Sequence, residues 1–104
     1  MKKELKLTDQ AKADLRNIRD YIAEDSPHNA QIFIAELTAK ILFIAEADFS
    51  GSSRDHLSEG LRALPFKRRC IYFRSYPDSI VIVRVLHGSQ DVAARHFSIE
   101  ESST

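Results

Sequence analysis

Three arginines and a histidine in the second half of the chain have side chains that could act together on an anionic group: Arg62, Arg74, Arg84 and His87. Arginine holds phosphate or carboxylate through two parallel hydrogen bonds, and histidine changes its charge near neutral pH. Arg84 interrupts an otherwise apolar stretch. Burying its charge would cost free energy unless the side chain faces solvent or forms an ion pair. Either Arg84 pairs with an acid such as Glu59, or these residues form a basic concave surface.

Charge is distributed unevenly, although the 104-residue chain has a net charge of zero. Residues 9–48 carry a net charge of −4, and residues 54–74 carry +4. The basic part includes the run Lys67, Arg68 and Arg69 just before a predicted strand. A basic region of this kind can meet phosphates or an acidic protein partner. The charge pattern alone does not separate these two.

Several enzyme chemistries have no support in the sequence. The histidines are isolated, without a CxxC or HExxH motif, so no metal is predicted. Three glycines in all make a nucleotide-binding loop unexpected, and no cofactor is predicted. Cys70 is the single cysteine, expected to be reduced and to pack as a small apolar side chain. The enzyme hypothesis that remains is RNA cleavage, with Arg62 and Arg84 stabilising charge and His87 or a tyrosine moving protons.

Two amphipathic helices are predicted to position these residues. Each has apolar residues at alternating steps of three and four, which is one face of a helix. Thr8 is the expected N-cap of the first helix, and Ser26 followed by Pro27 begins the second. The apolar stripes consist of Ala11, Leu15, Ile18 and Ile22 in the first helix and of Ala30, Ile34, Leu37, Ile41 and Ile44 in the second. Joined by a short connection, they form an antiparallel hairpin.

The second helix carries more apolar residues than one neighbour requires. Ile32, Phe33, Leu42 and Phe43 lie outside its stripe. The helix is therefore packed on two sides, or it presents a groove to a partner helix or strand.

Strands are predicted at residues 5–7, 61–66, 70–76 and 80–87, with a loop at 48–53 and a short helix within 89–97. The order β-α-α-β-β-β indicates a single α+β domain over residues 1–104, with the helical hairpin on one face of a mostly antiparallel sheet. In the last strand we expect Val81, Val83 and Val85 to face the helices. Arg84 would then lie on the uncovered face, together with Arg62.

The chain resembles the ParE branch of the ParE/RelE toxin superfamily, the toxins of bacterial type II toxin–antitoxin pairs. The resemblance extends from about residue 5 to 97 and rests on LTDQAKADLRNIRDYIAEDSP, Gly51 with Arg54, EGLRALPF, IYFR and IVIVRVLHGSQD. It implies a toxin that inhibits DNA gyrase and so blocks replication, or alternatively a RelE-like ribonuclease that cuts messenger RNA on the ribosome.

The resemblance also implies a partner, a small acidic ParD-like antitoxin with a ribbon-helix-helix segment. This antitoxin is expected to form a hetero-oligomer with the toxin. The toxin would contact DNA only indirectly, through the antitoxin complex. The residues expected to bind antitoxin or target are Arg62, Lys67, Arg68, Arg69, Arg74, Arg84, His87, Ile32, Phe33 and Phe43. The longest apolar run is five residues and the N-terminus lacks a secretory h-region, so a cytoplasmic protein without a membrane span is expected.

Overall fold

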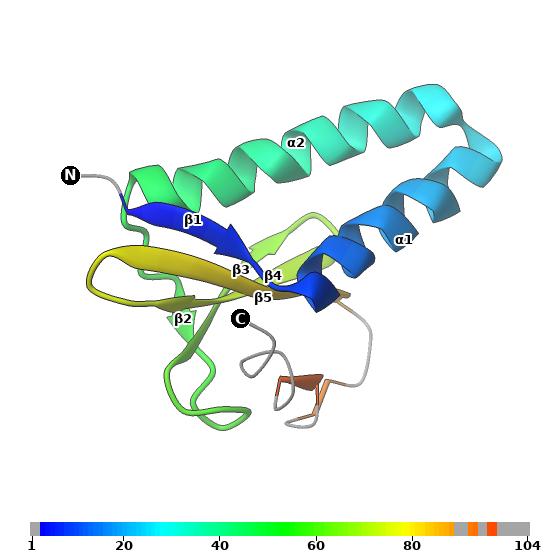
Figure 1. Ribbon diagram of the computed structural model, residues 1–104. Helices are drawn as coiled ribbons and strands as arrows, with labels where there is room; N and C mark the ends of the chain where they lie inside the picture. The colour runs from blue at the N-terminus through cyan, green and yellow to red at the C-terminus, as the bar shows by residue number, and fades with distance from the viewer. Residues whose placement is uncertain (1–2, 89–91, 94–95, 98–104) are drawn as a thin grey trace.

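The computed structural model describes residues 3–88, 92–93 and 96–97. In chain order the elements are β1 (Glu4–Leu7), α1 (Asp9–Asp25), α2 (Pro27–Glu46), β2 (Ser52–Ser53), β3 (Leu61–Phe66), β4 (Arg69–Ser75) and β5 (Ser79–His87). Figure 1 shows the two helices as a hairpin above the sheet. The predicted α+β architecture is confirmed. No helix in the described part of the chain has the length and apolar character needed to cross a bilayer.

The sheet has five strands in the order β1-β5-β4-β3-β2. β1 pairs with β5 in parallel, and the remaining pairs are antiparallel. The two-residue strand β2 lies in the segment predicted to be a loop, and it pairs only with Arg62 and Ala63. Pro65 consequently sits where β3 is the sheet edge, a position that needs no N–H donor. β5, which lies between β1 and β4, joins the start of the chain to the hairpin of β3 and β4.

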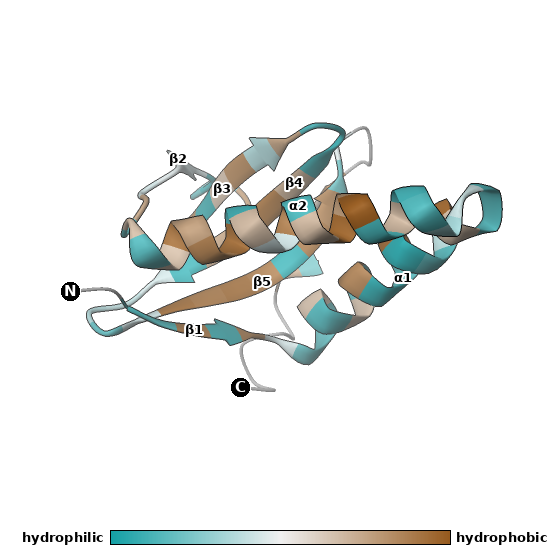
Figure 2. Cartoon of the chain, turned by 90° about the horizontal axis from the view of Figure 1, so that it is seen from above, coloured by the Kyte–Doolittle hydropathy of each residue, from teal (hydrophilic) through white to brown (hydrophobic). Residues whose placement is uncertain are grey.

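Both helices begin at the residues expected from the sequence. The Thr8 hydroxyl accepts a hydrogen bond from the Ala11 N–H at 3.0 Å, and the Ser26 hydroxyl accepts one from Asn29 at 3.1 Å. Pro27 occupies the first turn of α2. α2 is the more apolar helix, as its long brown stretches beside the mostly teal α1 show in Figure 2. Their inner faces pack on the sheet around Leu37, Ile44 and Phe73.

The opposite face of the sheet, expected to be uncovered, carries a second apolar core. Its buried residues are Leu61, Ala63, Cys70, Tyr72, Val83, Leu86 and Phe97. Phe97 is fully buried, and its ring lies 5.0 Å from that of Tyr72. The expectation of an open face was wrong, because residues near the C-terminus return across this side. The short helix predicted within residues 89–97 falls largely outside the described residues.

The predicted orientation of β5 is corrected by an irregularity in its pairing with β4. Ile80 and Ile82 face the helices, whereas Val81 and Val83 pack into the second core. Tyr72 pairs with Arg84 but Phe73 pairs with Ile82, so β5 has one additional residue at this point. Such a bulge interrupts the alternation of side chains. Val85 beyond it faces the helices as predicted.

Candidate functional site

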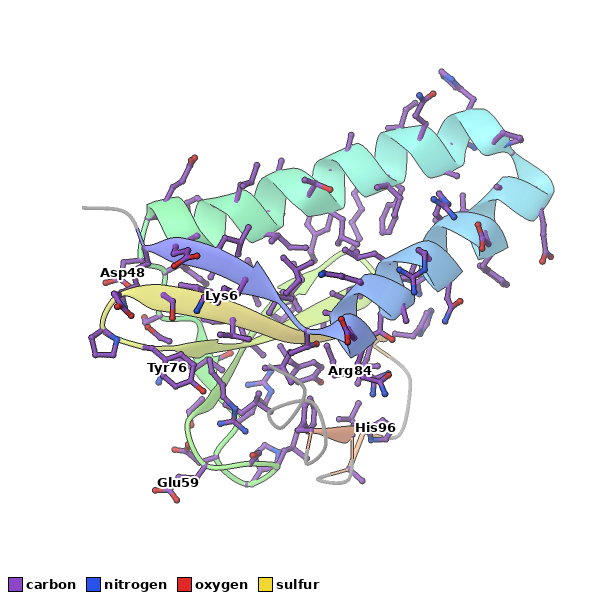
Figure 3. The ribbon with its side chains drawn as sticks, in the orientation of Figure 1. Lys6, Asp48, Glu59, Tyr76, Arg84 and His96 are labelled. Atoms are coloured by element: carbon purple, nitrogen blue, oxygen red, sulfur yellow. The ribbon has the colours of Figure 1, made fainter. Side chains whose placement is uncertain are left out.

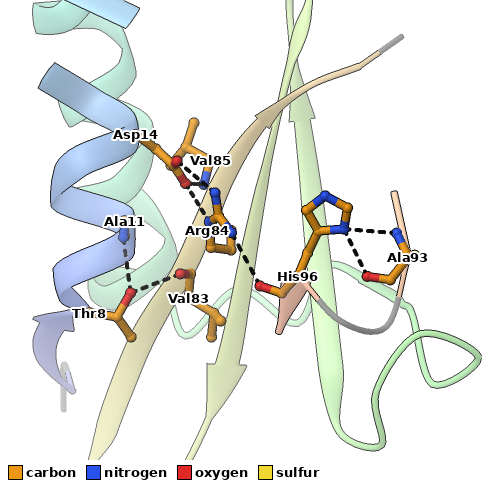
Figure 4. Close-up of polar contacts among 8 residues, drawn as sticks. All are labelled: Thr8, Ala11, Asp14, Val83, Arg84, Val85, Ala93 and His96. Carbon is orange, nitrogen blue, oxygen red and sulfur yellow. Dashed lines mark hydrogen bonds and ion pairs between the residues drawn. The ribbon is translucent and has the colours of Figure 1, made fainter. Parts of the chain in front are cut away.

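Arg84 forms a two-pronged ion pair with Asp14 of α1 (Figure 4). Its Nε donates to Asp14 Oδ2 at 2.8 Å and its Nη2 to Oδ1 at 2.9 Å. Nη1 donates to the carbonyl of His96 at 3.3 Å. The side chains of Arg84 and Asp14 are only 15% and 11% exposed. The expected pairing with Glu59 is therefore replaced by a pairing with Asp14, which also accepts a hydrogen bond from the Val85 N–H at 2.9 Å.

The position of Asp14 in α1 explains why it can reach β5. Asp14 follows Ala11 by three residues and precedes Ile18 by four, so it lies on the buried stripe of the helix. β1 pairs with β5 only as far as Ile82, and beyond this point α1 supplies the partners of the β5 backbone. The Thr8 hydroxyl donates to the Val83 carbonyl at 2.8 Å, two residues before the Val85 N–H that Asp14 accepts. The acidic residue on an apolar helix face was the sequence signal for this pairing.

Beside the ion pair is a cleft of about 340 Å³ between α1 and the ends of β4 and β5. α1 contributes Asn17 and the 71% exposed Tyr21, one turn apart. β4 contributes Arg69, and β5 contributes Arg84 and the exposed His87. We call this region the α1–β5 cleft. It brings together Arg69, Arg84 and His87, three of the residues expected to bind a partner.

Arg69 contributes a partly buried guanidinium to the α1–β5 cleft. Its buried Nε has no hydrogen-bond partner among the described residues. Desolvation by burial lowers the pKa of the Arg69 guanidinium, and the nearby Tyr21 opposes this shift. The guanidinium also lies 5.9 Å from the centre of the Phe33 ring. An anionic group entering the cleft would restore the charge balance, so the cleft is suited to holding a carboxylate or a phosphate.

Arg62 and Arg84 lie on opposite faces of the sheet, contrary to expectation. Arg62 pairs with Phe73, which belongs to the core under the helices, whereas Arg84 pairs with Tyr72 of the second core. Arg62 donates from Nε to the Ser50 carbonyl. The constellation on which the ribonuclease hypothesis rested is therefore not assembled. The Asp14 carboxylate is itself engaged by two hydrogen-bond donors of Arg84.

Arg74 is on the same face as Arg84 but lies in a different region. It pairs with Leu61 on one side and Val81 on the other, and it is 6% exposed. Its guanidinium donates to the Glu59 carbonyl and the Ser58 hydroxyl. Arg74 thus fixes the loop before β3, and it does not line the α1–β5 cleft.

Lys67 and Arg68 form the turn between β3 and β4, and both are exposed. The Lys67 ammonium pairs with Glu36 of α2 at 2.7 Å and lies 5.5 Å from the Phe66 ring centre. The Lys40 ammonium is 5.7 Å from the rings of both Phe43 and Phe66. Such contacts let cations cover aromatic rings while keeping their charge in water. We call Phe33, Lys40, Phe43, Phe66 and Lys67 the cation–aromatic surface.

The outer side of α2 has further exposed apolar residues. Ile32 is 46%, Leu42 43% and Phe43 44% exposed, whereas Phe33 packs partly against the core. The wide apolar surface predicted for α2 is therefore only partly used within the chain. Ile32 and Phe43 are eleven residues apart and so lie on nearly the same side of the helix.

Cys70 and Tyr72 are neighbours in the second core. Cys70 is a free, buried cysteine, and burial raises the pKa of its thiol. Desolvation, together with the adjacent Cys70, raises the pKa of the Tyr72 hydroxyl to about 12. Neither group is poised for catalysis near neutral pH. No cluster of potential metal ligands occurs within the part of the chain that the structure describes.

Comparison with known proteins identifies the family. The sequence model described as the ParE toxin of the type II toxin–antitoxin system parDE matches residues 5–92. The chain belongs to the ParE toxin family. A search of curated protein sequences finds no relative. Among solved structures, a chain of the chromosomal ParDE toxin–antitoxin system from P. aeruginosa superimposes with a TM-score of 0.70 at 25% identity, over 82% of this chain and 95% of that one.

The ParE-type assignment covers all the elements that build the site. Residues 5–92 extend from β1 through β5, and so include Asp14, the α1–β5 cleft and the cation–aromatic surface. This chain is thus a ParE-type toxin of a ParDE toxin–antitoxin system. The fold predicted from the sequence agrees with this family assignment.

Proposed function

We propose that this ParE-type toxin inhibits DNA gyrase and is neutralised by a cognate ParD-like antitoxin. The observation that carries the proposal is the ParE family match over residues 5–92, together with the ParDE-like fold. The geometry adds support, because the described surface around the site is rich in cations and exposed apolar side chains. Such a surface suits protein binding better than bond cleavage.

The antitoxin is proposed to bind the cation–aromatic surface and the exposed side of α2. Ile32 and Phe43 offer apolar contact, and Lys40 and Lys67 offer positive charge within the same region. A partner segment with apolar residues on one side and acidic residues at its margin is complementary to this surface. Burial of apolar area would supply most of the affinity, and the charges would steer the encounter.

Inhibition of gyrase is tested with purified gyrase and titrated toxin in a supercoiling assay. Loss of supercoiling together with trapped cleaved DNA is expected, and premixing the antitoxin should restore activity. A matched reaction contains the same toxin, purified ribosomes and messenger RNA. Unaffected supercoiling would contradict the gyrase proposal, and cleaved messenger RNA would replace it with the ribonuclease alternative.

Antitoxin binding is tested by calorimetry with purified antitoxin. Phe43→Ala should weaken affinity by roughly tenfold, the loss typical of an interface anchor. Gln10→Ala is a suitable control, because Gln10 is exposed in the first turn of α1 and is outside the proposed antitoxin surface. Affinity should also fall as salt is raised. Equal affinities of both variants would place the antitoxin on another surface.

A further inference from the structure

The α1–β5 cleft contains two guanidinium groups, and only one of them is used to hold the described fold together. Arg84 is engaged by the Asp14 carboxylate and by the His96 carbonyl. Figure 3 shows Arg84 between the start of α1 and the segment that carries His96. The Arg69 guanidinium, in contrast, forms no ion pair or hydrogen bond with any described residue. The Arg84–Asp14 pair is neutral as a unit, so the cleft retains the positive charge of Arg69.

The surroundings of Arg69 orient its guanidinium and desolvate it in part. Arg69 pairs with His87 across β4 and β5, so the two side chains leave the sheet on the same face. The guanidinium lies 5.9 Å from the centre of the Phe33 ring. Nε is the buried nitrogen of the group, which leaves the two Nη atoms as the edge that a ligand can reach. Such an edge binds a carboxylate through two parallel hydrogen bonds, and an anion there offsets the cost of desolvation.

The rest of the cleft is suited to an apolar stem that carries one carboxylate. Its apolar lining consists of Ile18, Val85 and Leu86, and α1 adds the amide of Asn17 and the hydroxyl of Tyr21. The volume of about 340 Å³ is in the range of small-molecule sites. One available guanidinium balances a monoanion, whereas the second charge of a phosphate monoester would lack such a partner. The charge and the lining together favour a monocarboxylate over a phosphate.

We propose that the α1–β5 cleft is a binding site for a small organic acid, a single carboxylate on an apolar stem, with the carboxylate held by the two Nη atoms of Arg69. The stem lies against the apolar lining. Asn17 and Tyr21 are the additional hydrogen-bond donors at the α1 side of the cleft. The guanidinium selects for the acid over its neutral amide, and burial of the stem provides affinity that acetate lacks.

The proposal is tested by nuclear magnetic resonance titration of the full chain with 3-phenylpropionate and with its neutral counterpart 3-phenylpropionamide. Saturable shifts are expected at Tyr21, Arg69 and Val85, with the acid binding about tenfold more tightly than the amide. Arg69→Gln should abolish this preference. Arg68→Gln is the matched control and should preserve it, because Arg68 is an exposed arginine of the preceding turn that does not line the cleft.

Arg69→Lys provides a second measurement, which also serves if Arg69→Gln does not fold. Lysine keeps the positive charge but lacks the planar fork of the guanidinium, so the preference for the acid should fall to about threefold. An undiminished preference in Arg69→Lys would contradict the two-pronged contact.

Equal binding of the acid and the amide, or the same preference in Arg69→Gln, would overturn the proposal. Phenyl phosphate and N-acetylglutamate N-methylamide, titrated at matched ionic strength, test the class of ligand. Weaker binding of both than of 3-phenylpropionate supports a site for a free organic acid. Tighter binding of the phosphate, or of the blocked glutamate that represents a carboxylate of a partner protein, would contradict it. No measurement involves gyrase or antitoxin, so the outcome is separate from that of the proposed function.

Discussion

The Arg84 guanidinium and the Asp14 carboxylate meet through two hydrogen bonds of 2.8 and 2.9 Å between residues 70 positions apart in the sequence. The same carboxylate accepts the Val85 N–H, where β5 has passed the end of β1. The pair therefore attaches α1 to residues 83–87 of β5, the part of this strand that does not pair with β1. Arg84 has a structural role, whatever it contributes to partner binding.

Arg84→Ala is expected to destabilise the protein by about 2–4 kcal/mol, because it leaves a mostly buried carboxylate without its cation. Chemical denaturation measures the loss. Arg19→Ala is the matched control, since Arg19 and Asp20 form a pair in which both side chains are more than half exposed, 54% and 66%. In the double variant Asp14→Ala/Arg84→Ala the cost should be smaller than the sum of the single costs. Simple additivity would contradict the structural pairing.

Gly51→Ala should destabilise the protein by more than about 3 kcal/mol. Gly51 has φ of +62°, and an added Cβ would lie 2.6 Å from the Ala63 carbonyl oxygen and 2.9 Å from the Phe73 ring. Gly60→Ala is the comparison, because φ is +82° there but the nearest atom to the added Cβ is 3.4 Å away. Backbone strain alone predicts a cost of about 1 kcal/mol at Gly60. Equal melting temperatures of the two variants would show that the close contacts relax freely.

Stability should decline at alkaline pH because of Tyr72. The pKa of its hydroxyl is raised from 10.0 to about 12 by burial in the second core, so the folded state retains its proton longer than the unfolded state does. The contribution is complete below pH 10.0 and is lost as pH rises towards 12, with a size on the order of 2 kcal/mol. Melting temperatures of Cys70→Ala and Cys70→Ala/Tyr72→Phe across this range isolate the effect. If the melting temperatures of the two variants depend on pH in the same way, the predicted contribution of Tyr72 is contradicted.

Phe97→Ala and Phe43→Ala should separate stability from binding. Phe97 is fully buried against Tyr72, and its truncation should cost about 3–4 kcal/mol through the cavity that it leaves. Phe43 is 44% exposed, so its truncation should cost less than about 1 kcal/mol. Thermal denaturation of the isolated toxin compares the two. A large loss for Phe43→Ala would mean that any binding defect in this variant reflects folding.

Much of the fold follows from local patterns in the sequence. The Thr8 and Ser26 caps and the alternating steps of three and four determine the helices. The alternation in residues 61–66 and the aromatic and β-branched residues of 70–76 predict two strands. The orientation of β5 was missed, because the bulge opposite Tyr72 and Phe73 depends on pairing with another strand. The sequence of a single apolar strand does not indicate where a bulge will form.

The candidate site was only partly predictable. The sequence grouped Arg84 with His87, and both line the α1–β5 cleft. It assigned Arg69 only to the basic turn before β4, because the sequence does not show that the ends of β4 and β5 lie side by side. The face of the sheet on which Arg62 lies was predicted wrongly. Its neighbours Leu61 and Ala63 pack into the second core, so Arg62 projects from the other face. Asp14 was overlooked, although a carboxylate on an apolar helix stripe and an arginine in an apolar strand are complementary signals. Considering both together would have predicted the ion pair.

Thr8 connects the first helix to the last strand, because its N–H donates to the Ile82 carbonyl and its hydroxyl to the Val83 carbonyl. β5 also lies between β1 and β4 in the sheet. A nascent chain on the ribosome therefore lacks both β5 and these Thr8 contacts until residues 79–87 have emerged. The domain therefore cannot complete its fold before β5 is available to pair with both β1 and β4.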